Sequence, residues 1–186
     1  MNFLCKNLEI NKNTAIDHID VHDLKKCLIS RFSIRWQNKM KQSARDQSGK
    51  LRTYALFKNT LCYEKYLSTI DNFEVRKCFT AFRISSHNLA IERGRYRHIE
   101  VNDRKCNICK NGEVEDELHF LFGCNKYTDK RKIFLEFIFN KCKNFKELSV
   151  TNKLIWLMSC EDNQIILQFA KYIFDCFNIR TMHTVA

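Results

Sequence analysis

Three cysteines and one histidine between positions 106 and 124 constrain this chain more than any other feature of its sequence. Two residues separate Cys106 from Cys109, nine separate Cys109 from His119, and four separate His119 from Cys124. Thiolate sulfur and imidazole nitrogen are the usual ligands of structural Zn²⁺, which takes four of them in a tetrahedron. The spacing therefore predicts one zinc ion held by all four residues. Because three cysteines and a histidine close the coordination shell, the predicted site is structural rather than catalytic.

The residues between the ligands predict a tight knuckle followed by a short helix. Asn111 and Gly112 supply a turn after the first cysteine pair, and residues 113–122 are predicted to form a helix with acidic residues in its first turn. Gly123 ends that helix and lets the chain turn, so that Cys124 returns to the metal. Two other interpretations stay open: a chance thiol pair beside an ordinary histidine, and a thioredoxin-like redox pair, although no βαβ pattern surrounds it.

The chain has ten cysteines, and most of the others lie in amphipathic stretches beside Leu, Phe, Ile and Tyr. These are Cys27, Cys62, Cys78, Cys142, Cys160 and Cys176. A reduced cysteine in such a place behaves as a small buried hydrophobe, so a secreted disulfide scaffold is disfavoured. Residues 1–10 lack the apolar centre of a secretory signal, and no apolar run approaches the roughly 20 residues of a membrane-spanning helix. The sequence predicts a soluble intracellular protein, cytoplasmic or nuclear, with no membrane partner.

The charge balance is strongly basic. The chain carries 32 Lys and Arg against 21 Asp and Glu, a net charge of +11 at pH 7. An excess of this size favours a polyanionic partner, usually nucleic acid. A lysine-rich solvated surface in a protein from an AT-rich genome would give the same composition, so both interpretations stay open. With 45% hydrophobic residues, the chain has ample material for a core.

Apolar residues that recur at steps of three or four predict a mainly α fold. The first helix is expected over 20–44, with an apolar stripe formed by Val21, Leu24, Leu28, Phe32 and Trp36. Further helices are expected at about 51–61, 63–70, 73–84, 127–143, 151–159 and 162–180, with Thr151 and Asp162 capping the last two. Phe73, Phe79 and Phe82 are expected to face the core.

Residues 85–102 have weak helical periodicity and are predicted to form an ordered loop or short strand leading into the cysteine cluster. The expected organisation is a basic helical region over 1–99, a CCHC zinc-binding module over 100–128, and C-terminal helices over 129–186 that pack on the rest. His87 stands beside Ser85 and Ser86, but no acidic partner is evident, so a structural role is expected for it.

The sequence resembles the zinc-binding segment downstream of reverse transcriptase in non-LTR (LINE-like) retrotransposon proteins. The residues that carry this resemblance in the finger are 104–109, 114–124 and Tyr127, and those before it are 50–54, Phe57, Lys58, Arg83, 85–87, Ile91, Glu92 and 94–96. In the tail they are 156–159, Glu161, Asp162 and 171–173. The likeness covers about three quarters of the chain, from near Trp36 to Arg180. It implies contact with nucleic acid, RNA or DNA.

Two departures from this family stand out. Asn125 follows the last cysteine where the family often has proline, a change that leaves the ligands intact. No Tyr-x-Asp-Asp occurs, and a polymerase needs paired aspartates to hold its two metal ions. The chain therefore resembles a detached C-terminal piece without catalytic machinery, and we expect neither enzyme activity nor a small-molecule substrate.

A basic strip beside the finger is the predicted nucleic-acid contact. It comprises Arg93, Arg95, Tyr96, Arg97, His98, Arg104 and Lys105. Arginines contact phosphates, and an aromatic ring between them can stack on an unpaired base. Equally, Tyr96 could pack on the zinc module while the arginines are solvated or ion-paired. A second class of function also stays open, in which the finger only staples helices and the aromatic tail helices bind a protein. The sequence specifies no oligomeric state.

Overall fold

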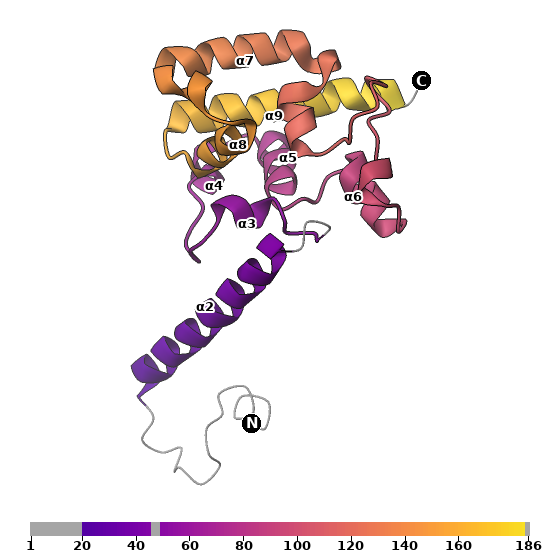
Figure 1. The fold of residues 1–186 in the computed structure, drawn as a ribbon. Helices are drawn as coiled ribbons and strands as arrows, with labels where there is room; N and C mark the ends of the chain where they lie inside the picture. Colours follow the sequence, from indigo (N-terminus) through magenta and orange to yellow (C-terminus); the bar gives the residue numbers. More distant parts are fainter. Residues whose placement is uncertain (1–19, 46–48, 185–186) are drawn as a thin grey trace.

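The computed structural model of the chain describes residues 20–45 and 49–184, and these residues are mainly helical (Figure 1). The α-helices are α2 (Val21–Arg45), α3 (Tyr54–Phe57), α4 (Tyr66–Thr69), α5 (Phe73–Arg83), α6 (Ala90–Tyr96), α7 (Thr128–Lys141), α8 (Val150–Ser159) and α9 (Asn163–Thr184). Short 3₁₀ turns occupy η2 (Val101–Asp103), η4 (Asn125–Tyr127) and η5 (Lys143–Glu147), and a π-helical turn forms η3 (His119–Gly123). This confirms the predicted mainly α fold.

The C-terminal helix α9 lies at the centre of the helical body (Figure 1). It packs against α4, α5, α7 and α8. Its apolar face is almost completely buried, as the side chains of Ile165, Ile166, Phe169, Ala170, Tyr172, Ile173 and Cys176 show. Burying a large apolar side chain contributes about 1.5–3 kcal/mol, so this one face supplies much of the driving force for folding.

Aromatic rings connect α9 to its neighbours. Phe134 of α7 stacks on Tyr172, with ring centroids 4.7 Å apart, and Phe79 of α5 meets Phe169 edge to face at 5.6 Å. Phe120, in the turn that carries His119, packs 4.6 Å from Phe177. The metal-ligand segment is thus part of the same core as the tail helices, because its own aromatic residue is inserted there.

Helix α2 differs from the others because it projects from the body (Figure 1). The predicted stripe is largely open: Val21 is 79% exposed and Phe32 is 60% exposed, while Leu24, Leu28 and Trp36 are half-buried. Among the side chains of α2 that the structure describes, only that of Met40, near the C-terminal end, is buried. The periodicity predicted the helix correctly. It could not show that most of the apolar stripe would stay uncovered by the body.

Several predicted elements have other bounds or another conformation. The helix expected at 51–61 is the single turn α3, and Phe73, expected in the core, is 62% exposed. The loop or strand predicted over 85–102 is interrupted by α6 at residues 90–96, while residues 85–89 and 97–100 are irregular as expected. Ser149 rather than Thr151 caps α8, by accepting a hydrogen bond from the backbone N–H of Asn152 at 3.2 Å.

The other predicted cap is confirmed. Asp162 Oδ1 accepts hydrogen bonds from the backbone N–H groups of Gln164 at 2.8 Å and Ile165 at 3.0 Å. These bonds satisfy two of the first donors of α9, and they lower the pKa of the Asp162 carboxyl. Within the described ranges, no helix is long and apolar enough to cross a membrane.

Candidate metal centre and the surface beside it

The four predicted metal ligands come together in the folded chain. The sulfur atoms of Cys106, Cys109 and Cys124 and a ring nitrogen of His119 all lie within 4.8 Å of one another, so this group could hold a metal ion. Cys106, Cys124 and His119 are buried, and Cys109 is half-buried. His119 Nε2 lies 3.4 Å from Cys109 Sγ, which identifies Nε2 as the nitrogen that faces the sulfur atoms.

The first two cysteines lie on a short hairpin. The backbone N–H of Cys106 donates to Glu113 O at 2.9 Å, the N–H of Glu115 donates to Arg104 O at 2.9 Å, and an antiparallel β-bridge joins Lys105 to Val114. Gly112 closes the hairpin with φ +80°, a conformation that glycine adopts without strain. The helix predicted over 113–122 therefore begins later, because its first three residues are extended.

The histidine and the last cysteine lie on the π-helical turn η3. The backbone N–H of Cys124 donates to His119 O at 2.7 Å, five residues earlier, and this widened turn brings the two ligands to the same side. Tyr172 Oη donates to Leu121 O at 2.6 Å and Arg131 Nη2 donates to Cys124 O at 2.6 Å. Side chains of α7 and α9 therefore satisfy carbonyl groups that a regular helix would have paired.

The pKa values of the clustered side chains shift in different directions. A hydrogen bond from the Cys124 thiol lowers the pKa of Cys106 to about 3, and the same contact raises the pKa of Cys124. The pKa of His119 is raised, first by its hydrogen bond with Cys106. A lowered pKa favours the thiolate form of Cys106, which is the form in which cysteine binds metals.

Glu113 orients the histidine, and sequence reasoning did not single it out. Its Oε2 lies 2.8 Å from His119 Nδ1 and also accepts a hydrogen bond from Asn111 Nδ2 at 3.0 Å. Metal-binding histidines usually donate their second ring nitrogen to a carboxylate or carbonyl. An acidic residue six positions before a candidate histidine ligand is the only sequence signal that could have indicated this contact.

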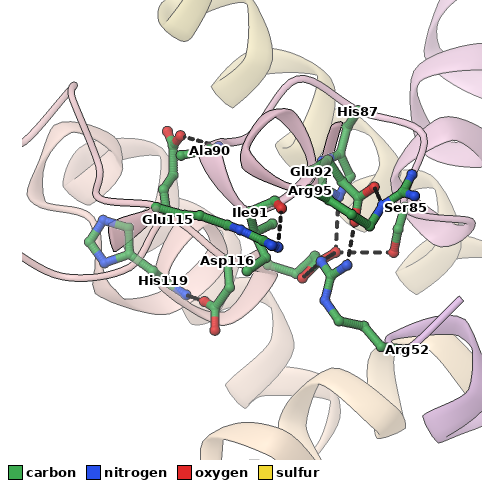
Figure 2. Close-up of polar contacts among 12 residues, drawn as sticks. Arg52, Ser85, His87, Ala90, Ile91, Glu92, Arg95, Glu115, Asp116 and His119 are labelled. Carbon is green, nitrogen blue, oxygen red and sulfur yellow. Dashed lines mark hydrogen bonds and ion pairs between the residues drawn. The ribbon is translucent and has the colours of Figure 1, made fainter. Parts of the chain in front are cut away.

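Helix α6 is attached to the hairpin by Glu115. The carboxylate accepts a hydrogen bond from the backbone N–H of Ala90 at 2.7 Å, and the Glu115 carbonyl accepts from the N–H of Ile91 at 3.1 Å (Figure 2). A residue 25 positions away in the chain thus caps the first turn of α6. Glu115 also forms a buried ion pair with Arg180 of α9 at 2.8 Å.

Arg104 attaches the other end of α6. Its guanidinium donates through Nε to Ile99 O and through Nη1 to Ile91 O, both at 2.9 Å. Its side chain lies directly over Gly94, where an added Cβ would come within 2.5 Å of Arg104 Cγ. Glycine is needed in α6 for this close approach.

A buried network of charges connects α6 to neighbouring segments (Figure 2). Arg52 forms ion pairs with Glu92 and with Glu117, the second at 2.7 Å. Glu117 Oε1 also accepts a hydrogen bond from Ser85 Oγ at 3.1 Å and lies 3.0 Å from His87 Nε2. Burial alone would raise the pKa of Glu117, but its contacts with His87 and Arg52 outweigh that effect and lower it to about 2.

This network gives His87 the acidic partner that its sequence neighbourhood does not show. Ser85 and His87 contact the same oxygen of Glu117, and all three side chains are buried. The arrangement joins the segment after α5 to the segment after the hairpin. A structural role for His87 stays a prediction.

The residues of the predicted basic strip fall into two groups. Tyr96 is 67% exposed, and Arg97, His98 and Lys105 are also exposed around it. Arg95 lies over the Tyr96 ring at 4.2 Å and forms an ion pair with Glu92 at 3.2 Å. Arg104 is only 6% exposed, and its guanidinium donates to the carbonyl groups of Ile91 and Ile99. Arg93 is half-buried, which is intermediate between the exposed residues and the buried Arg104.

Comparisons with protein-family models, with curated proteins and with solved structures found no match to this chain. The interpretation of the metal centre and of the surface beside it rests on their own geometry.

Proposed function

We propose that this chain is a zinc-stabilised, non-catalytic nucleic-acid-binding module, related to the region downstream of reverse transcriptase in non-LTR retrotransposon proteins. One observation carries the proposal: an exposed tyrosine among basic side chains lies on a helix that hydrogen bonds join to the metal-ligand hairpin. The nine described cysteines are free thiols, as zinc binding in a reducing intracellular compartment requires.

Zinc suits the donor set best. Three sulfur atoms and one imidazole nitrogen form a soft tetrahedral set, which favours Zn²⁺ over Mg²⁺ or Ca²⁺. With Zn–S near 2.3 Å and Zn–N near 2.0–2.1 Å, neighbouring ligand atoms lie about 3.5–3.8 Å apart. The 4.8 Å limit of the cluster is only slightly wider, so small side-chain rotations close the site.

Metal analysis of purified protein tests the zinc site. Wild type is expected to carry one zinc ion per chain, and Cys109→Ser and His119→Ala should lose zinc and melt at lower temperature. Cys27→Ser is the matched control, because Cys27 is an exposed cysteine on α2. Equal zinc content and melting temperature in all four proteins would refute the site.

The surface around Tyr96 has the chemistry of a single-strand contact. An aromatic ring can stack on an unpaired base, and arginine or lysine beside it neutralises backbone phosphates. The Arg95 guanidinium lies over one face of the Tyr96 ring, 4.2 Å from the centroid, so a positive charge is already present at the stacking surface. Arg97, His98 and Lys105 extend the positive charge to both sides.

Binding measured by fluorescence anisotropy against salt tests this surface. We expect log K to fall linearly with log salt, with a slope of about −0.7 per neutralised phosphate for single strands and −0.9 for duplexes. Tyr96→Ala should weaken single-strand binding by about 1–3 kcal/mol through lost stacking. Lys132→Ala, which removes an exposed charge from α7, is the control. Wild-type affinity no better than that of a scrambled basic peptide would refute nucleic-acid binding.

A protein-interaction module is the second candidate function, and α2 favours it. On the aromatic tail helices, Phe169 and Tyr172 of α9 are buried, which leaves Leu167 and Met182 as exposed apolar side chains of that helix. On α2, however, Val21, Ile29, Phe32 and Ile34 are all more than half exposed. A binding partner retained at high salt, and lost on Phe32→Ser rather than on Tyr96→Ala, would favour this candidate.

A further inference from the structure

A small cationic cavity lies between the C-terminal end of α6 and the cysteine hairpin. Its volume is about 160 Å³, and its polar lining comes from Arg93 and Arg97 of the α6 region and from Asp103, Arg104, Lys105 and Asn107 of the hairpin side. This is well below the roughly 300–1,000 Å³ of cavities that enclose a whole small molecule. The space suits one compact group rather than a nucleoside.

The lining charges point to an anion. Four cationic side chains face one carboxylate, Asp103, so the formal charge is 4 − 1 = +3. Arginine is suited to tetrahedral oxyanions, because its planar donors can contact two oxygen atoms at once. Asn107 adds an uncharged amide donor at the rim, where it is exposed.

One lining cation, Arg104, is held in place by hydrogen bonds. Arg104 is only 6% exposed, and its hydrogen bonds to Ile91 O and Ile99 O hold the guanidinium in one orientation. Such a buried cation loses little side-chain entropy when an anion arrives, because it is already ordered. The absence of a Cβ at Gly94 makes room for it.

Arg93, which also lines the cavity, has unused donor capacity. Arg93 Nε is buried and makes no hydrogen bond, although buried donors in folded proteins are nearly always paired. Cations near the C-terminal end of α6 also balance the partial negative charge of its last carbonyl groups. This effect would explain the position of the arginines without any ligand. The two explanations differ in what substitution does: a purely structural arginine affects stability and leaves anion binding unchanged.

We infer that this cavity is a phosphate-binding subsite that takes one backbone phosphate of a nucleic acid strand whose base stacks near Tyr96. The inference rests on the proposed nucleic-acid function. Lys105 and Asn107 line the subsite and flank the candidate metal ligand Cys106. A metal ion that orders the hairpin would therefore also hold these two side chains in position. Phosphate affinity is therefore expected to fall when the metal is removed.

The test uses the full zinc-loaded chain and two probes: inorganic phosphate, and a fluorescent single-stranded DNA oligonucleotide. In nuclear magnetic resonance spectra, inorganic phosphate should shift the Arg93 and Arg97 Nε–H signals. Arg93→Gln and the exposed Arg97→Gln should each weaken oligonucleotide binding about tenfold and reduce the salt slope by about 0.7, as expected for one lost phosphate contact. Lys132→Gln removes the same charge from α7 and should do neither.

The outcomes separate the subsite from the wider proposal. If wild type binds the oligonucleotide but both arginine variants match Lys132→Gln, the subsite is refuted and nucleic-acid binding stands. If the oligonucleotide fails to bind while inorganic phosphate shifts the two arginine signals, the subsite takes a free phosphate and the nucleic-acid part is refuted. If phosphate shifts no signal and no slope changes, the cavity is structural. If the Arg93→Gln protein does not fold, the Arg97→Gln protein still decides the test, because Arg97 is exposed and its substitution should not affect folding.

Discussion

Glu113 contacts the imidazole of His119 and determines which ring nitrogen faces the cysteine sulfur atoms. Its carboxylate lies 2.8 Å from Nδ1, which leaves Nε2 facing Cys109 Sγ at 3.4 Å. The carboxylate thereby selects the ring nitrogen that is available to a metal and holds the ring in place. Because Glu113 itself is not a ligand, its effect on metal binding can be separated from loss of a bond to the metal.

Glu113→Ala should lower zinc affinity about 10–100-fold while zinc still binds with a stoichiometry of one, because an orienting partner is lost and all four ligands remain. Competition with a chromophoric zinc chelator measures this. Glu136→Ala, an exposed carboxylate on α7, is the control and should bind zinc as wild type does. Unchanged affinity in Glu113→Ala would show that the contact has no orienting role.

The cysteines outside the metal centre span a wide range of reactivity. Hydrogen bonds from Thr60 and then Lys58 lower the pKa of the exposed Cys62. Burial instead raises the pKa of Cys176 to about 12 and that of Cys78 to about 11. Since the thiolate is the reactive form, position in the fold decides which thiols are chemically active.

Cys62 should be alkylated by iodoacetamide at lower pH than Cys176, which should stay unreactive until the protein unfolds. The sign follows from the shifts: a lowered pKa gives thiolate at lower pH, and a raised pKa delays it. Peptide mass spectrometry across a pH series measures both. Thr60→Val should move the Cys62 profile to higher pH; the same profile in both proteins would contradict the assigned cause.

Helix α6 owes its conformation to contacts distant in the sequence. Its seven residues include Gly94, and glycine costs about 1 kcal/mol in a helix interior relative to alanine. Glu115 supplies the cap at Ala90 that no neighbouring residue provides, and Arg104 bonds the carbonyl of Ile91. The helix therefore depends on the hairpin that carries the first two candidate metal ligands.

Gly94→Ala tests this dependence by double-mutant analysis. Helix propensity alone would make alanine stabilising, but its Cβ would overlap Arg104, so we expect a loss of about 1–3 kcal/mol in unfolding free energy. In an Arg104→Ala background the overlap is gone, and the same substitution should cost much less. Equal costs in both backgrounds, measured by urea unfolding, would contradict this packing.

The molecule as a whole divides into a packed body and a projecting helix. Phe82 is completely buried beside Phe120 and Phe177, whereas Phe32 on α2 is 60% exposed. Phe82→Ala is expected to cost about 3–5 kcal/mol, because it leaves a cavity. Phe32→Ser should change stability by no more than about 0.5 kcal/mol. Chemical denaturation measures both, and comparable losses would show that α2 packs more closely than described.

Metal removal should loosen the molecule in a defined order. Hydrogen exchange after chelation is expected to rise first at the backbone N–H groups of Ile91, Glu115 and Cys124, which bond within the hairpin, α6 and η3. Amides of α5 and α9, in the aromatic core, should keep their protection for longer. A uniform rise across all helices would instead show that the metal supports the entire fold.

Local patterns in the sequence were sufficient for the long helices and for the ligand set. The bounds of α5 and α8 are close to the prediction, and Asp162 caps α9, because apolar periodicity and capping act over a few residues. The four candidate ligands could be found for the same reason, since a knuckle has a fixed spacing. Cys106, Cys109, His119 and Cys124 do lie together.

The sequence by itself thus determined the helical class and the residues able to bind a metal. Only the tertiary structure decided that residues 90–96 form a helix, that Arg104 is buried and that α2 leaves its apolar stripe open. Each of these outcomes depends on partners far along the chain, such as Glu115 for Ala90, or on the lack of a partner within the described residues. Periodicity reports which face of an element is apolar, but three-dimensional packing determines what covers it.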